Sequence, residues 1–180
     1  MGTEEKLASL FQLDRAESST TFYHIHLSTH KAQFLLGEVF GEHTQLNSSG
    51  QIAADEWQQI AVAHQRDITL DLWTVLPNGV RALVAVGHTG SPIYSKQQSL
   101  KPRALSSFVA GFKAAAAKRI NLIRGVPGAP VWERGYQEQR ISDTKTLDRV
   151  RRLLTTQAAG LIVENTEIFL DASQLSPLVE

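Results

Sequence analysis

The chain has 180 residues, of which 42% are hydrophobic and 20% are charged. This balance excludes a largely disordered protein, and the length suits one domain with a short appendage. No apolar run reaches the roughly 18 residues of a transmembrane helix, and the acidic start is unlike a signal peptide. Because cysteine is absent, disulfides and thiolate metal sites are excluded, which favours a cytoplasmic location.

The composition along the chain predicts three parts. They are an N-terminal arm (residues 1–20), a folded domain (21–160) and an acidic C-terminal tail (161–180). In the domain, alternating apolar residues predict a first strand over residues 21–28 and a hairpin over 33–47. Ser48-Ser49-Gly50 is expected to interrupt the structure before a helix that runs from Ile52 to about Ala63.

The centre of the domain is a pair of strands. Residues 68–75 and 80–86 flank Pro77-Asn78-Gly79, a sequence typical of a hairpin turn. The second strand is apolar on both faces, which indicates a central strand covered on both sides.

A polar loop over residues 87–99 precedes a long helix, which is expected to begin near Pro102 and to stop at Gly125. A short strand then ends near Ile141, and Asp143 is placed to cap a last helix over residues 146–156. We therefore predict an α+β fold of the ferredoxin-like kind, an antiparallel sheet covered on one side by two main helices.

Charge is segregated along the chain, although 18 basic and 18 acidic residues cancel overall. No acidic residue lies between Asp71 and Glu133, and nothing after Arg152 is basic. Such segregation indicates a surface for a polyanion, the alternative being a solvated helix face. The basic residues of this interval are Arg81, Lys96, Lys101, Arg103, Lys113, Lys118, Arg119 and Arg124.

Several segments, in order and spacing, resemble the REP-associated tyrosine transposases, which are single-tyrosine relatives of the HUH nuclease superfamily. The likeness covers roughly residues 22–159. Its main segments are Leu72 to Val86, Tyr23-His24-Ile25, Leu36-Gly37-Glu38-Val39, the long stretch Ser107 to Trp132, Arg134-Gly135-Tyr136 and Leu147-Asp148-Arg149-Val150-Arg151. The resemblance implies a ferredoxin-like HUH transposase fold and DNA as the partner.

This sequence differs from the family at the positions of the family's catalytic residues. Its two metal-binding histidines correspond to Gly79 and Arg81, and its nucleophilic tyrosine corresponds to Leu153. Leucine has no nucleophilic atom, and a guanidinium cannot ligate a cation. The sequence therefore predicts a transposase-like protein without catalytic residues, without a metal and without a cofactor.

The leading hypothesis is a DNA-binding protein that recognises hairpin or single-stranded DNA and no longer cuts it. RNA stays open as the ligand, and a homodimer is one option for the assembly. The alternatives are a scaffold that binds no nucleic acid and an active transposase with a rebuilt site. The expected DNA-binding residues are Arg81, Lys113, Lys118, Arg119, Arg124, Arg134 and Tyr136.

Four side chains have rival interpretations. Arg81 either takes the place of the metal beside a phosphate, or reaches solvent or a carboxylate such as Glu138. Tyr136 is a packed or base-stacking aromatic, or a substitute nucleophile. His24 and His26 share one face of a strand. Either one is a core histidine and the other is exposed to solvent, or the two form a new metal-binding pair.

Overall fold

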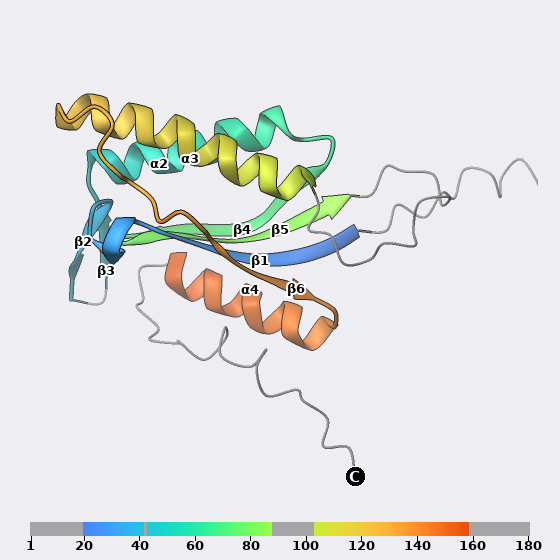
Figure 1. Ribbon diagram of the computed structural model, residues 1–180. Helices are drawn as coiled ribbons and strands as arrows, with labels where there is room; N and C mark the ends of the chain where they lie inside the picture. Colours follow the sequence, from blue (N-terminus) through green and yellow to red (C-terminus); the bar gives the residue numbers. More distant parts are fainter. Residues whose placement is uncertain (1–19, 42, 88–102, 159–180) are drawn as a thin grey trace, which may run out of the picture.

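A computed structural model describes residues 20–41, 43–87 and 103–158 (Figure 1). The predicted acidic tail lies outside the described residues, as do the predicted arm up to residue 19, the loop over residues 88–99 and Pro102. In the part that is described, no helix is long and apolar enough to cross a bilayer.

A four-stranded antiparallel sheet forms the middle layer of the domain. Its strand order is β4-β5-β1-β6, and a helical connection precedes both β4 and β6, which is the ferredoxin-like arrangement. The predicted strands and their antiparallel pairing are confirmed. The strands are β1 (Thr20–Ser28), β4 (Ile68–Leu76), β5 (Gly79–Gly87) and β6 (Gln137–Ile141).

Helices cover both faces of this sheet (Figure 1). The predicted pair, α2 (Ser48–Ala63) and α3 (Arg103–Arg124), packs together on one face, and α4 (Thr144–Ala158) lies on the other. The α+β prediction is confirmed, and α4 adds a layer that the prediction of two covering helices did not include. Two adjacent layers therefore bury β5 and β1, which explains why β5 is apolar on both faces.

The start of α2 differs from the prediction. Ser48, Ser49 and Gly50 form its first turn, because the Asn47 side chain caps the helix by accepting a hydrogen bond from the Gly50 N–H at 3.1 Å. Gly50 is required there, since a Cβ would come within 2.0 Å of the Leu36 carbonyl oxygen.

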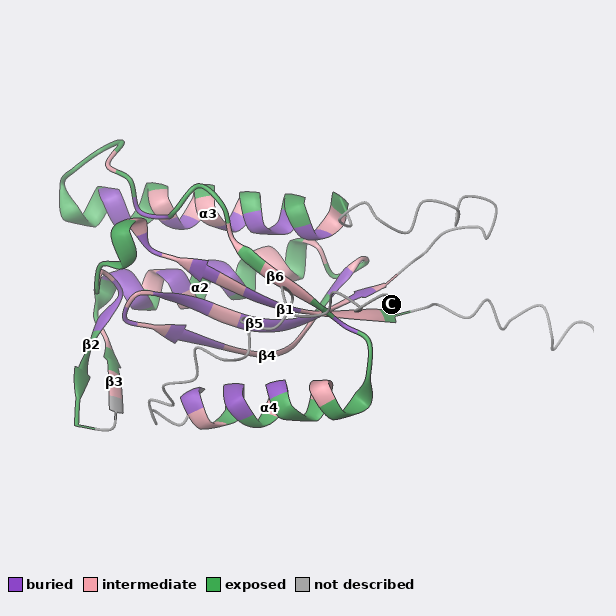
Figure 2. Ribbon diagram, turned by 60° about the horizontal axis from the view of Figure 1, so that its bottom comes forward, coloured by how far each residue is buried: buried purple, intermediate pink, exposed green. Residues whose placement is uncertain are grey.

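The main core lies between the sheet and the α2–α3 layer. Trp57 of α2 meets Phe108 and Phe112 of α3 edge to face, with ring centroids 4.9 and 4.8 Å apart. All three side chains are fully buried, and Figure 2 shows buried positions along both helices. This contact fixes the two helices against each other and leaves the opposite face of the sheet to α4.

A smaller core holds α4 in place. Leu153 and Leu154 pack on Leu83 of β5. At the surface, Arg151 donates two hydrogen bonds to Asp71 of β4, at 3.0 and 2.5 Å, and its guanidinium stacks over the Phe22 ring. As predicted, Asp143 caps α4, accepting from the Thr146 N–H at 2.8 Å.

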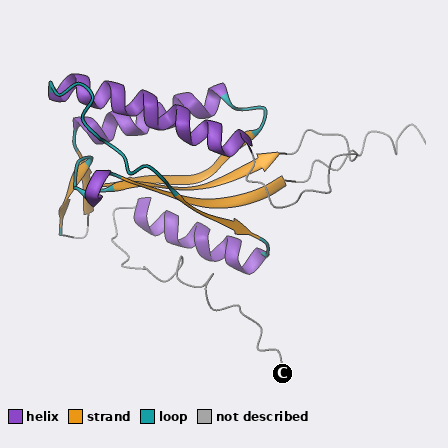
Figure 3. Cartoon of the chain, viewed as in Figure 1, coloured by secondary structure: helices purple, strands orange, loops and turns teal. Residues whose placement is uncertain are grey.

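At one end of the sheet lie a short hairpin, β2 (Gly37–Phe40) and β3 (His43–Leu46), and a helical turn, η1 (His30–Ala32). The loop from α3 to β6 passes this end (Figure 3). It leaves α3 at Gly125, whose φ of 66° ends the helix where the sequence predicted.

Candidate functional site

A row of polar side chains crosses the α4 face of the sheet. In the strand register, His26 of β1 lies opposite Arg81 of β5 and Gln137 of β6, and Arg81 in turn lies opposite Thr74 of β4. Directly opposed residues of antiparallel strands point to the same face. This row therefore joins all four strands of the sheet.

Arg81 is half-buried in this row and is not neutralised. Its Nε is buried without a hydrogen-bond partner, and no ion pair to Arg81 is formed among the described residues. Burial lowers the pKa of the guanidinium, although arginine stays charged at any physiological pH. The suggested partner Glu138 lies opposite Ile25, on the other face, so that interpretation of Arg81 is wrong.

Position 79 has no room for a side chain. A Cβ built on Gly79 would lie 2.3 Å from the carbonyl oxygen of Leu27 and 3.3 Å from Nε2 of His26. The backbone of β1 and the imidazole of His26 therefore occupy the space that a residue at 79 would need. A histidine ligand at this position requires the two strands to move apart.

Leu153 lies in the small core on the same face as Arg81. It is 6% exposed and packs with Leu83, two residues beyond Arg81 in β5. The positions that the family resemblance singles out, 79, 81 and 153, thus all lie at the interface between α4 and the sheet. They provide a close backbone contact, a cation and an apolar side chain.

One turn after Leu153 comes Gln157, which is also 6% exposed and has a buried Oε1 without a hydrogen-bond partner. This last turn of α4 lies at the end of the sheet where β5 begins (Figure 1). On β6, Gln139 likewise has a buried Oε1 without a partner.

His24 and His26 have different environments. His24 is fully buried, and burial, followed by the charges of Arg81 and His26, lowers its pKa to about 4. His26 donates from Nδ1 to Oε1 of Gln137 at 3.3 Å, and burial and Arg81 lower its pKa. Within the described residues, no three histidine or carboxylate side chains are arranged to hold a metal ion.

A divalent cation does not fit this site. The first family ligand position cannot hold a side chain, and the second carries a fixed positive charge that repels a cation. The neutral imidazoles of His24 and His26 lie beside that charge.

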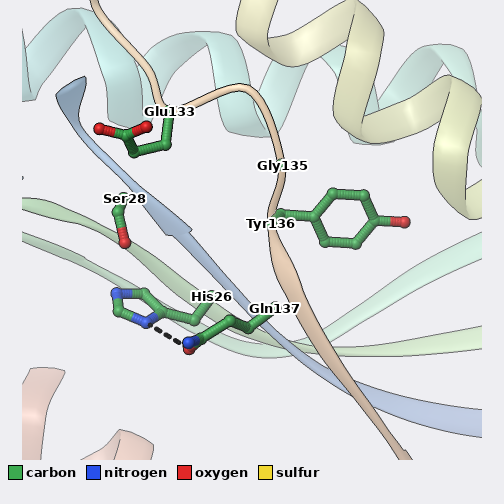
Figure 4. A pocket seen from close by; sticks show the side chains of 6 residues that line it. All are labelled: His26, Ser28, Glu133, Gly135, Tyr136 and Gln137. Atoms are coloured by element: carbon green, nitrogen blue, oxygen red, sulfur yellow. Dashed lines mark hydrogen bonds between the residues drawn. The ribbon is translucent and has the colours of Figure 1, made fainter. Parts of the chain in front are cut away.

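A pocket of about 340 Å³ opens beside this row at the β6 edge, and Figure 4 shows its lining. His26 and Ser28 of β1 and Gln137 of β6 form one side, and Glu133 and Gly135 come from the loop before β6. The Glu133 carboxylate accepts a hydrogen bond from the Lys31 N–H at 2.6 Å and lies 3.6 Å from His30.

Tyr136 lines this pocket, but its ring points away from His26 and Gln137 (Figure 4). The ring packs against the main core on the α2–α3 side. Burial, followed by interaction with Glu138, raises its pKa to about 12. A buried phenol on the opposite face from Leu153 is a poor substitute for the missing nucleophile.

The basic residues predicted on α3 lie across the sheet from Arg81. Lys118 and Arg124 are exposed, and Arg124 donates to Asn121 at 3.4 Å. Arg119 pairs with Glu56 of α2 at 2.6 Å, which neutralises it within the protein. Lys113 donates to the carbonyl oxygens of Glu133 and Gly135 at 2.8 and 2.5 Å, so it anchors the loop that carries the exposed Arg134.

Sequence reasoning missed His26 as a neighbour of Arg81, and it did not predict that Gln157 is buried. The pairing of residues 21–28 with residues 80–86 could have suggested the first, since it places i, i+2 residues of both strands on one face. The family resemblance aligns Gln157 with an asparagine after the nucleophile, but a glutamine in a helical pattern is normally a surface residue.

The sequence matches no protein-family model and no curated protein at a significant level. Among solved structures, it is similar to a "putative transposase" from Deinococcus radiodurans R1, with 18% identity over 79% of this chain and 95% of that chain and a TM-score of 0.49. It is also similar to the REP-associated tyrosine transposase bound to a REP hairpin, with 13% identity over 79% and 67% of the chains and a TM-score of 0.48. With TM-scores below 0.5, neither likeness bears on what this chain does.

Proposed function

We propose that this protein binds hairpin or single-stranded DNA as a relative of the single-tyrosine transposases and does not cleave it. The support is the α4 face of the sheet. Three positions at which the sequence resemblance implies metal ligands and a nucleophile all lie on this face. They carry Gly79, which has no room for a side chain, the cation Arg81 and the buried Leu153.

Strand cleavage by the family reaction needs an oxygen nucleophile and a metal that polarises the phosphate. Gly79, Arg81 and Leu153 offer neither a nucleophilic oxygen nor a metal ligand, whereas Arg81 carries a positive charge suited to a phosphate. Binding without cleavage is therefore the function that these residues support best.

The surface available to DNA runs around the β6 edge. Arg81 and the α3 cations lie on opposite sides of the sheet, and the loop that carries Arg134 passes between them, held by Lys113. A single strand that follows this edge would meet Lys118 or Arg124 on α3, then Arg134, and then the pocket beside His26.

We expect no covalent adduct when the protein is mixed with magnesium or manganese and single-stranded DNA that contains a hairpin. The reason is the missing oxygen at Leu153 and the absence of room for a ligand at Gly79. A denaturing gel with end-labelled DNA measures this directly. A protein–DNA band that survives denaturation, at whichever residue it maps, would contradict the proposal.

We expect binding to weaken with salt. Four phosphate contacts to a single strand give a slope of about −3 in log K against log salt, and the double variant Lys118→Ala, Arg124→Ala should flatten it by about 1.4. The matched control, Lys145→Ala with Arg149→Ala, removes two exposed cations from α4 and should leave the slope unchanged. Fluorescence anisotropy over a salt series measures both.

The same experiment distinguishes the proposed DNA binding from the alternative of a scaffold that binds no nucleic acid. A specific observation favours that alternative, because Arg119 and Lys113 are already engaged inside the protein. Absence of binding at low salt would support the scaffold, as would equal slopes for both double variants.

A further inference from the structure

We propose that Arg81, with His26 and Gln137 in the same row of the sheet and Gln157 at the same end of the sheet, forms a receptor for one phosphate group that works without a metal ion. The proposal rests on the proposed function for its natural ligand, a phosphodiester of DNA. The receptor itself can be tested without DNA.

The charge of Arg81 is unbalanced within the part of the chain that the structure describes. Its Nε is buried without a partner, and among the described residues no carboxylate pairs with it. A half-buried cation with an unsatisfied donor destabilises the fold, because the buried N–H has lost its bonds to water. Arginine in the same protein can be satisfied internally, as the pairs Arg119–Glu56 and Arg151–Asp71 demonstrate.

The residues across the sheet from Arg81 are not acidic. Register places His26 and Thr74 directly across from Arg81, and Gln137 lies beyond His26. None of the three carries a negative charge that would compete with an anion. The one carboxylate in the adjoining pocket, Glu133, already accepts from the Lys31 N–H at 2.6 Å.

Gln157 is buried in the last turn of α4, at the end of the sheet where β5 begins (Figure 1). Its Oε1 lacks a partner although the side chain is 94% buried, given its exposure of 6%. An amide turned by 180° keeps its shape and presents two N–H donors. Together with the planar fork of Arg81, such donors suit the oxygens of a phosphate.

The experiment compares the parent protein with Arg81→Met, a variant of similar length without the charge. Inorganic phosphate is the probe, titrated against sodium chloride of equal ionic strength, and thermal unfolding is the first readout. Phosphate should raise the Tm of the parent and leave that of Arg81→Met unchanged. The control Arg140→Met removes an arginine that lies opposite Tyr23, on the other face of the sheet, and should respond like the parent.

The Tm without phosphate separates a binding role from a structural one. If Arg81 is kept for a ligand, Arg81→Met should unfold at the same temperature as the parent or higher, because an unsatisfied buried cation has been removed. A lower Tm together with unchanged phosphate binding would overturn the proposal. A second readout is the NMR titration of His26, whose pKa should rise when phosphate lies beside it.

DNA forms the last arm. Affinity for a hairpin with a single-stranded flank should fall at least tenfold in Arg81→Met and should be insensitive to chelator. Unchanged DNA affinity in Arg81→Met would refute the receptor and leave the proposed DNA binding intact. Phosphate binding that depends on Arg81, without any DNA binding, would refute the proposed function and leave the receptor in place. No effect of phosphate on the parent protein would refute the receptor outright.

Discussion

Replacing Gly79 by alanine is expected to destabilise the fold by about 1–3 kcal/mol, the usual penalty for forcing a methyl group into a packed site. The new Cβ would lie 2.3 Å from the Leu27 carbonyl oxygen, which is backbone and can move only with β1. Urea denaturation measures the change in the free energy of unfolding.

The matched control is Gly87→Ala in the same strand. A Cβ there meets nothing within 4 Å, so its effect should be small. Equal destabilisation by the two substitutions would show that the close approach of Gly79 to the Leu27 carbonyl does not cause the loss of stability.

The same contact predicts the outcome of placing the residues of the resembling family at these positions. A triple variant, Gly79→His, Arg81→His and Leu153→Tyr, should fold poorly and should form no DNA adduct, because β1 and the His26 ring occupy the space of the first histidine. A stable variant that binds manganese would show that the strands separate easily.

Acid is expected to unfold this protein partly through His24. Its pKa is about 4 in the folded protein and about 6.5 in an unfolded chain, so between these values the unfolded state binds the extra proton. Stability should therefore rise with pH between about 4 and 6.5 and gain nothing more from His24 above that range. The contribution lost on acidification to pH 4 is about 3 kcal/mol, from roughly 1.4 kcal/mol per pKa unit.

The measurement compares the parent with His24→Gln by urea denaturation from pH 7 to pH 4. Carboxylates titrate in both proteins, so the difference between the two curves isolates His24. The charged groups that face His24 are Arg81 and His26, and Arg81→Met should reduce the effect only in part, since burial is the larger cause. Parallel curves for the parent and His24→Gln would contradict a buried, neutral His24.

Local sequence patterns determined most of the secondary structure. Pro77-Asn78-Gly79 predicted the turn between β4 and β5, Gly125 the end of α3 and Asp143 the cap of α4. These signals are local, since each depends on the backbone conformation that one or two residues favour. The start of α2 was predicted too late, and this error has a local cause as well. Ser48, Ser49 and Gly50 are typical loop residues, but here they form the first turn of the helix because the Asn47 side chain caps it.

The identity of the residues at 79, 81 and 153 was sufficient to predict the loss of the family's cleavage chemistry, because no packing can supply an oxygen to leucine. Their surroundings were not predictable from the sequence. The register of β1 against β5 places His26 over Gly79 and beside Arg81, and one residue of slippage would have turned both side chains to the other face.

The sequence by itself thus determined which elements form, and it predicted which chemistry is absent, since both follow from residue type and short-range spacing. Only the tertiary structure decided that α4 covers the second face of the sheet and that Arg119 forms an ion pair with Glu56. It also placed Arg81 and the α3 cations on opposite sides of the sheet. These outcomes depend on contacts between residues far apart in the chain, such as Arg119 with Glu56 and Leu153 with Leu83. Such contacts are set by how the layers pack, which short-range patterns do not encode.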